Sequence, residues 1–112
     1  MQIYRLGEFE EIVLLSVGIL YDKAYGVSIR EEIMERLNRK VSVGALQSAL
    51  RRLEKKGYLT SKLGESTSKR GGRPKLFFML TAEGRDALAY SRDVRNSMWD
   101  AIPHSVFKLK TY

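Results

Sequence analysis

The 112-residue chain contains no cysteine, one histidine and two prolines. Without cysteine it can form neither a disulfide nor a cysteine-based zinc site, and His104 alone cannot build a histidine cluster. Its longest uncharged apolar run, Ile12 to Leu20, is shorter than the ~20 residues that cross a bilayer. The first residues, MQIYRLGEFEE, are acidic and unlike a secretory signal. These absences predict a soluble, cytoplasmic chain without metal, cofactor or membrane contact.

The residue groupings that enzymes use are also missing. The chain shows no nucleophile–base pair, no paired carboxylates at catalytic spacing and no glycine motif that would cradle a phosphate. Its length suits a single domain, which leaves no room for a separate catalytic one. We therefore predict that the protein is not an enzyme.

Positive charge is concentrated in one stretch of the chain. The net charge is +7, and residues 51–75 alone hold nine Lys/Arg against two Glu. Residues 1–40, in contrast, carry six Lys/Arg and seven Asp/Glu. A clustered basic patch is expected of a protein that binds the phosphate backbone of nucleic acid. The alternative is a solvated basic face that only keeps the protein in solution.

Apolar residues at helical spacing predict three helices in the first half of the chain. The first covers Leu6 to Leu20 and the second about Gly26 to Asn38. Ser42 is a good N-cap for the third, because its side-chain oxygen can accept from the free amides of the first turn. This helix runs to Lys56, and Gly57 suits the left-handed position that ends it.

The third helix has two distinct faces. One is apolar and is predicted to be buried (Leu46, Ala49, Leu50, Leu53). The other combines small residues, which permit close approach, with amide and basic groups that can bind base edges in the major groove. We predict that seven residues here contact DNA: Ser42, Gly44, Gln47, Ser48, Arg51, Arg52 and Lys55. An ordinary amphipathic helix with a polar outside is the alternative.

Two segments rich in strand formers follow, Tyr58 to Leu63 and Lys75 to Leu80. The polar sequence GESTSKRGGRP between them predicts a hairpin with a basic tip. Three helices followed by such a hairpin give a winged helix-turn-helix, a mainly α fold with a small β-hairpin. We predict that the wing contacts phosphates or the minor groove through Lys69, Arg70, Arg73 and Lys75. An ordinary loop is the alternative.

A fourth helix is predicted from Ala82 to about Ala101, capped by Thr81 and stopped by the Ile102–Pro103 step. Apolar and small residues form a short coiled-coil-like seam along it: Ala87, Leu88, Ser91, Val94 and Met98. A second copy of the chain would cover this seam, which predicts a homodimer. Residues 1–81 would then bind DNA and residues 82–112 would dimerise. The alternative is that the helix packs back onto its own domain.

Four blocks, LGEFEEIVLLSVGIL, YGVSIREEIMERL, VSVGALQSALRRLEKKGYL and GGRPKLFFMLTAEGRDAL, resemble in order and spacing the PadR family of bacterial transcriptional regulators. The resemblance covers roughly residues 6–90. It implies a winged-helix fold, a dimer built through the C-terminal helix and repression by binding inverted-repeat operators. It also implies that the third helix is the recognition helix. The short C-terminal part is similar to the smaller subgroup, which has a single C-terminal helix.

The sequence departs from the family pattern at two places. Many members carry Tyr where this chain has Gln47, and a Tyr pair where it has Phe77 and Phe78. Some small members respond to planar aromatic compounds at the dimer interface. If the two-fold axis passes near Trp99, two such rings would face each other and a planar effector could stack between them. Trp99 could instead pack within the interface or cap the helix end.

The sequence thus predicts a DNA-binding transcriptional regulator, a repressor that binds double-stranded DNA as a homodimer and that an aromatic ligand could release. A winged helix that binds RNA or a protein partner is the alternative, because this fold also mediates such contacts.

Overall fold

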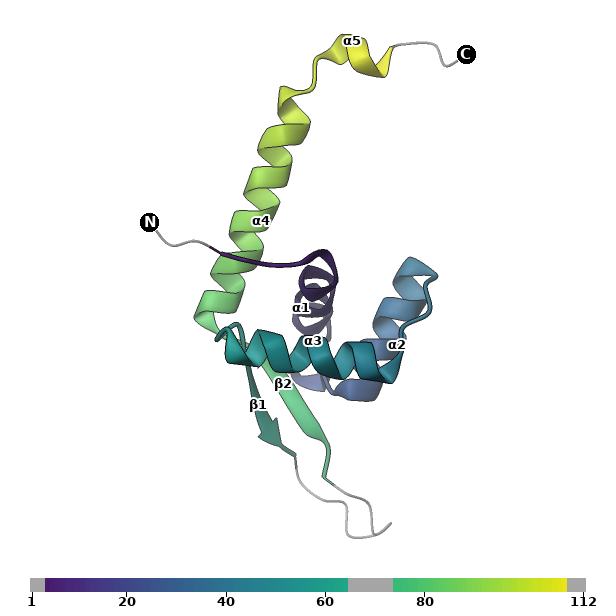
Figure 1. Ribbon diagram of the computed structural model, residues 1–112, viewed down its shortest axis with the longest axis vertical. Coiled ribbons are helices and arrows are strands. Elements are labelled where there is room, and N and C mark those ends of the chain that lie inside the picture. The colour runs from purple at the N-terminus through teal and green to yellow at the C-terminus, as the bar shows by residue number, and fades with distance from the viewer. Residues whose placement is uncertain (1–3, 65–73, 109–112) are drawn as a thin grey trace.

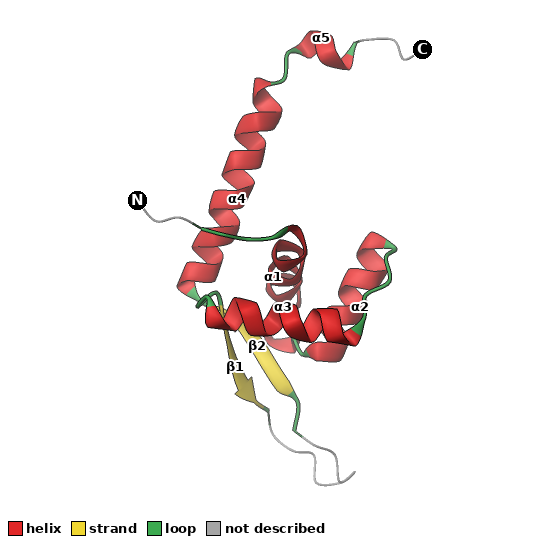
Figure 2. Cartoon of the chain, viewed as in Figure 1, coloured by secondary structure: helices red, strands yellow, loops and turns green. Residues whose placement is uncertain are grey.

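The computed structural model describes residues 4–64 and 74–108. Figures 1 and 2 show a compact group of helices, with a hairpin at one end and a long helix leaving at the other. The elements are α1 (Glu8–Leu20), a 3-10 turn (Tyr21–Lys23), α2 (Gly26–Leu37), α3 (Val43–Lys55), β1 (Leu59–Leu63), β2 (Leu76–Leu80), α4 (Ala82–Ala101) and α5 (His104–Phe107). The predicted mainly helical fold with one hairpin is confirmed.

Local hydrogen bonds fix the ends of α3 and α4 where the sequence predicts them. The Ser42 hydroxyl accepts from the Ala45 amide at 3.0 Å, and Gly57 ends α3 with φ of 83°. The Thr81 hydroxyl accepts from the Gly84 amide at 3.0 Å and donates to the Gly57 carbonyl at 2.6 Å. Thr81 therefore links the start of α4 to the end of α3.

Most boundaries agree with the predicted ones to within one residue, and two features differ by more. Helix α1 begins at Glu8 rather than Leu6, because the Glu10 carboxylate accepts from the Gly7 amide and caps the helix there. Beyond Pro103 the chain forms the short helix α5, where the sequence predicted only a tail. A proline before the first helical residue suits such a turn, since its missing N–H needs no partner.

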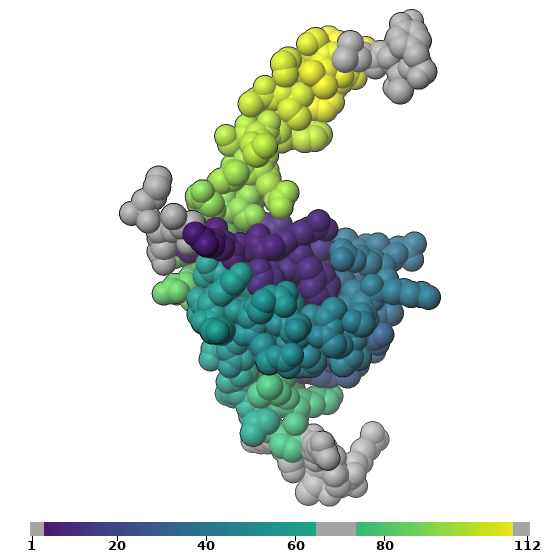
Figure 3. Space-filling view, viewed as in Figure 1, coloured from purple at the N-terminus to yellow at the C-terminus, as the bar shows by residue number. Residues whose placement is uncertain are grey.

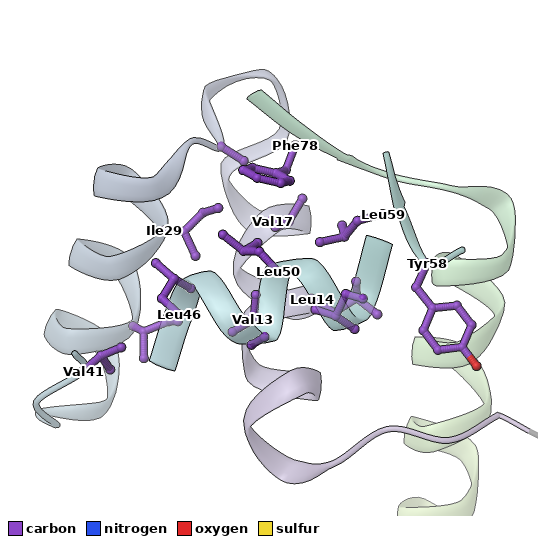
Figure 4. Packing of buried hydrophobic residues seen from close by; sticks show 14 of the residues in the cluster. Val13, Leu14, Val17, Ile29, Val41, Leu46, Leu50, Tyr58, Leu59 and Phe78 are labelled. Atoms are coloured by element: carbon purple, nitrogen blue, oxygen red, sulfur yellow. The ribbon is translucent and has the colours of Figure 1, made fainter. Parts of the chain in front are cut away.

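Helix α1 lies at the centre of the core and contacts α2, α3, β2 and α4. Its Val13, Leu14 and Val17 are buried, and Figure 4 shows them among side chains of α2, α3 and both strands. The four residues of the predicted apolar face of α3 are all buried against this helix. Complete burial of a large aliphatic side chain contributes about 1.5–3 kcal/mol, so this contact adds substantially to the stability of the domain.

The hairpin is anchored through β2 to the turn between α1 and α2. Strands β1 and β2 pair antiparallel from Leu59↔Leu80 to Leu63↔Leu76. The Phe78 amide donates to the Ala24 carbonyl at 2.8 Å, and Tyr25 forms a bridge with Phe77. This attachment fixes the direction in which the hairpin leaves the domain.

Helix α4 starts in close contact with the domain and then leaves it (Figures 1 and 3). A Cβ added at Gly84 would lie 2.1 Å from the Tyr58 carbonyl oxygen, so only glycine allows this approach. Ala87 is completely buried, and the Ser91 hydroxyl donates to the Glu11 carboxylate. Val94 and Met98 are exposed. The predicted seam is therefore divided, because its first half packs on the chain's own domain.

We expect Gly84→Ala to destabilise the fold by about 1–3 kcal/mol, since the new methyl group must push α4 away from the Tyr58 carbonyl. Gly44→Ala is the matched control, because a Cβ there meets nothing within 4 Å. Alanine is a better helix former than glycine, so this variant should gain up to ~1 kcal/mol. Urea unfolding measures both changes. Unchanged stability of Gly84→Ala would contradict the close contact.

Candidate nucleic-acid interface

The outer face of α3 combines exposed polar groups with small residues. Gln47, Arg51 and Lys55 are exposed, as are Ser42 and Gly44 near the start of the helix, while Ser48 is half-buried. Arg51 and Lys55 have no ion-pair partner within residues 4–64 and 74–108. Of the seven residues predicted to contact DNA from this helix, only Arg52 forms an ion pair with another element in the described parts of the chain.

The start of α2 borders the start of α3. A Cβ at Gly26 would lie 3.4 Å from Nε2 of Gln47, and both residues line a groove of about 180 Å³ between the two helices. Val27 and Val43 on its two sides are both exposed. Sequence reasoning missed Val27, although its position off the buried Ile29–Ile33 face of α2 was a signal. A valine methyl in this place can contact a thymine methyl.

Lys75 directly precedes β2, at the loop end of the hairpin, and lies next to the start of α2. Its Nζ lies 4.1 Å from the centre of the Tyr25 ring, a cation–π contact. The Tyr25 ring meets Phe77 edge-on, with centroids 5.6 Å apart. Tyr25 was also missed from the sequence, because only the tertiary fold brings it to the hairpin. The predicted wing residues Lys69, Arg70 and Arg73 lie outside the described residues.

Arg52 is placed differently from its neighbours on α3. Its Nε lies 3.2 Å from Glu10 of α1, and Nζ of Lys56 lies 2.8 and 2.9 Å from the two oxygens of the same carboxylate. The Glu10 side chain is only 7% exposed, whereas that of Arg52 is 52% exposed. Arg52 of α3 and Lys56 at its C-terminal cap thus hold the helix on α1, and Arg51 and Lys55 stay available for a ligand.

The charges around Glu10 lower its pKa. Burial of the carboxyl raises the pKa, but hydrogen bonds from Lys56, the Gly7 amide and Arg52 outweigh that effect. The sequence showed Glu10 only as one of three acids in the first turn of α1. Its place three residues after Gly7 was the signal for a capping role.

An exposed helix with a polar and basic face, preceded by a second helix and followed by a hairpin, defines a winged helix-turn-helix protein. This is a DNA-binding fold. No helix within residues 4–64 and 74–108 combines the length and the hydropathy needed to span a membrane.

Comparison with known proteins identifies the family. Residues 13–90 match the transcriptional regulator PadR-like family. The chain therefore belongs to the PadR-like family of transcriptional regulators. A search of curated proteins found no significant match.

Solved structures of similar proteins have the same architecture. A PadR family transcription regulator from Clostridium difficile is 31% identical, with a TM-score of 0.62 over 80% of this chain and 91% of that one. RosR from H. salinarum is 26% identical, with a TM-score of 0.67 over 88% and 81%. A PadR-like transcription factor from Bacteroides fragilis is 24% identical and shares the fold, with a TM-score of 0.69 over 82% and 84%.

Because the pKa of Glu10 is lowered in the folded chain, its ion pairs stabilise the protein above the ordinary carboxyl pKa. This stabilisation is lost as the pH falls through the lowered value. At neutral pH we expect Glu10→Gln to cost about 1–3 kcal/mol. The difference from the unaltered chain should shrink below about pH 5, as urea unfolding at several pH values would show.

Glu8→Gln is the control for this experiment. Glu8 lies in the same turn, but its side chain is 79% exposed and its contact with Arg39 is long, at 3.7 Å. Its replacement should change stability by no more than about 0.5 kcal/mol at any pH. Equal effects of the two substitutions would contradict a specific role for Glu10.

Proposed function

We propose that this protein is a cytoplasmic repressor that binds an inverted-repeat operator in double-stranded DNA as a homodimer, without enzymatic activity or a cofactor. Residues 1–81 would bind DNA and residues 82–112 would hold the dimer together. The observation that carries this proposal is the outer face of α3, where Gln47, Arg51 and Lys55 are exposed and the two cations have no ion-pair partner in the described parts of the chain.

In this proposal α3 enters the major groove, which is about 12 Å wide and accepts a helix. Gly44 and Ser48 allow its first half to approach closely. Gln47 and Arg51 bind base edges, because amide and guanidinium groups can each make two hydrogen bonds to one base. Lys55 and the N-cap Ser42 contact phosphates. Arg52 is tied to Glu10 but half exposed, so it can reach a phosphate beside the helix.

The wing adds contacts that do not depend on sequence. Lys75 lies at the loop end of its strands, on the Tyr25 ring near the start of α2. The tip carries Lys69, Arg70 and Arg73, which would contact phosphates or the minor groove. Each phosphate contact releases counterions from DNA, so the wing would supply affinity that falls as salt rises.

Exposed residues of α4 support the proposed dimer. Val94 and Met98 are uncovered on a helix that projects from the domain, and apolar side chains in such a position favour a second protein surface. Leu88, which is partly buried, lies at the edge of this seam. A two-fold symmetric dimer presents two recognition helices, which matches two half-sites in inverted orientation.

Trp99 would contact an effector. Its side chain is 63% exposed, and one side of the ring packs against Phe107 with the centroids 5.2 Å apart. A planar aromatic compound could stack on the open side and alter the distance between the recognition helices. We expect a planar cationic dye to quench the fluorescence of Trp99, the single tryptophan, and to weaken operator binding. No quenching up to ~100 μM would refute the site.

Titrations with DNA and RNA test the main proposal. We expect the protein to bind duplex DNA from upstream of its own gene more tightly than RNA of equal length. Gln47→Ala and Arg51→Ala should each weaken this binding by ~1–3 kcal/mol and weaken random DNA less. Arg36→Ala is the control, since this exposed cation pairs with Glu32 on α2. Preference for RNA would favour the alternative, an RNA-binding winged helix.

The wing should behave differently in that assay. Replacing Lys69, Arg70 and Arg73 together by Ala should weaken operator and random DNA alike. The slope of log affinity against log salt should decrease by about 0.9 for each phosphate that the altered wing no longer neutralises. An unchanged slope would mean that the tip does not touch DNA.

A further inference from the structure

The groove between the starts of α2 and α3 has two apolar sides. Val27, the second residue of α2, and Val43, the first residue of α3, are 59% and 58% exposed and line it from the two helices. Single exposed apolar residues are common on soluble proteins and need no function. Here two valines line one groove beside Gln47, in the part of α3 that is proposed to enter DNA. Together they favour an apolar group on the ligand.

Gln47 brings a free amide to the same groove. It lies four residues after Val43, and residues at this spacing share a helix face, with Cβ atoms about 5–6 Å apart. Its Nε2 lies against Gly26, where an added Cβ would be 3.4 Å away. Among the residues that the structure describes, the Gln47 amide has no hydrogen-bond partner. Such an amide can bind N6 and N7 of an adenine.

The two sides of the groove are held in place by Arg30. Its Nε donates to the Val41 carbonyl at 2.6 Å, which ties α2 to the residues before α3. Val41 is buried, as is Leu46 of α3, which also lines the groove. The two valines and Gln47 therefore belong to a preformed surface, and a ligand that binds there would have little of the chain to order.

The groove lies on the side of the domain that would face DNA. Tyr25, which precedes α2, forms a bridge with Phe77 and carries Lys75 on its ring. Figure 1 shows the start of α2 on the side from which the hairpin projects, away from α4. A ligand that contacts both α3 and the hairpin would therefore cover this groove.

A base edge suits this groove better than a phosphate does. Its sides are apolar, and Glu31 adds a carboxylate that would repel a phosphate, while the Nε of Arg30 is already bound to Val41. The major groove of DNA presents one apolar group, the C5-methyl of thymine. Successive bases on a strand are about 3.4 Å apart, so valines one helical turn from Gln47 reach about two base pairs beyond the base that it binds.

We propose that Val27 and Val43 select thymine, by contact with its methyl group, within about two base pairs of the adenine that Gln47 binds. Val27 would thus add sequence specificity from α2, outside α3. The inference rests on the proposed function and specifies part of the base sequence in each half-site. Burial of one methyl group should strengthen binding about fourfold.

Removal of the thymine methyl groups from DNA tests the proposal before the operator is known. The region upstream of the protein's own gene is copied once with thymidine and once with deoxyuridine triphosphate, so both duplexes keep the same hydrogen-bonding edges and phosphates. We expect the full chain to bind the thymine duplex at least about fourfold more tightly, measured by fluorescence anisotropy. In Val27→Ala and Val43→Ala this ratio should move towards one, because only binding to the thymine duplex weakens.

Two further variants are controls. Arg51→Ala removes a proposed hydrogen bond but no methyl contact, so it should weaken both duplexes alike and preserve the ratio. Leu37→Ala shortens an exposed side chain at the other end of α2 and should change neither affinity. The valine variants should keep the urea unfolding midpoint of the unaltered chain, since both side chains are exposed.

5-Methylcytosine gives an independent measurement at a single position. Selection from random duplexes identifies the T·A pair whose importance is lost in Val27→Ala or Val43→Ala. This pair is then replaced by C·G, with or without a methyl group at C5 of the cytosine, which occupies the same place in the major groove. The methylated pair should bind the unaltered chain about fourfold more tightly than the unmethylated one, and the valine variant equally.

The outcomes separate this proposal from the proposed function. Equal affinity of the unaltered chain for the thymine and uracil duplexes would overturn the methyl contact and leave the repressor proposal standing. Valine variants that weaken both duplexes alike would also overturn it, since the valines would then act through the shape of the surface. Failure of the unaltered chain to bind either duplex would refute both proposals. A ratio that falls only in the valine variants would establish the methyl contact.

Discussion

The arrangement of the whole domain depends on the burial of α1. Val13, Leu14 and Val17 are almost completely removed from solvent, and the helix contacts α2, α3, β2 and α4 at once. Interiors packed to this density transmit displacements instead of absorbing them. The orientation of α3, the attachment of the hairpin and the direction of α4 are therefore all set against one helix. This explains why so small a domain can hold its proposed DNA-binding and dimerisation surfaces in a defined relation.

Two consecutive carboxylates on α1 also connect this helix to its neighbours, through hydrogen bonds and ion pairs. Glu10 binds Arg52 of α3 and Lys56 at the end of that helix, whereas Glu11 binds Ser91 and Arg95 of α4. One turn of α1 is thus tied to α3 on one side and to α4 on the other. Because Glu10 is buried, its ion pairs are less screened by solvent than those at the surface. Through these two adjacent residues, α1 connects α4 directly to α3.

Much of the fold could be predicted from the sequence because its signals are local. Ser42, Gly57 and Thr81 end or begin helices through hydrogen bonds and dihedral angles that involve only a few neighbouring residues. The buried face of α3 follows from the 3.6-residue period and needs no knowledge of what covers it. The hairpin likewise follows from two short runs of strand formers around a polar loop.

The sequence by itself determined the order of the four main helices and the hairpin, the winged-helix class and the polar face of α3. Only the tertiary structure decided which charged and apolar side chains already have a partner within the chain. Arg52 is bound by Glu10, which lies 42 positions earlier, and Lys75 rests on Tyr25. Ala87 is buried against the chain's own domain and the Ser91 hydroxyl donates to Glu11, while Val94 and Met98 stay exposed. A side chain's partner depends on contacts between residues far apart in the chain, and neither periodicity nor composition records those contacts.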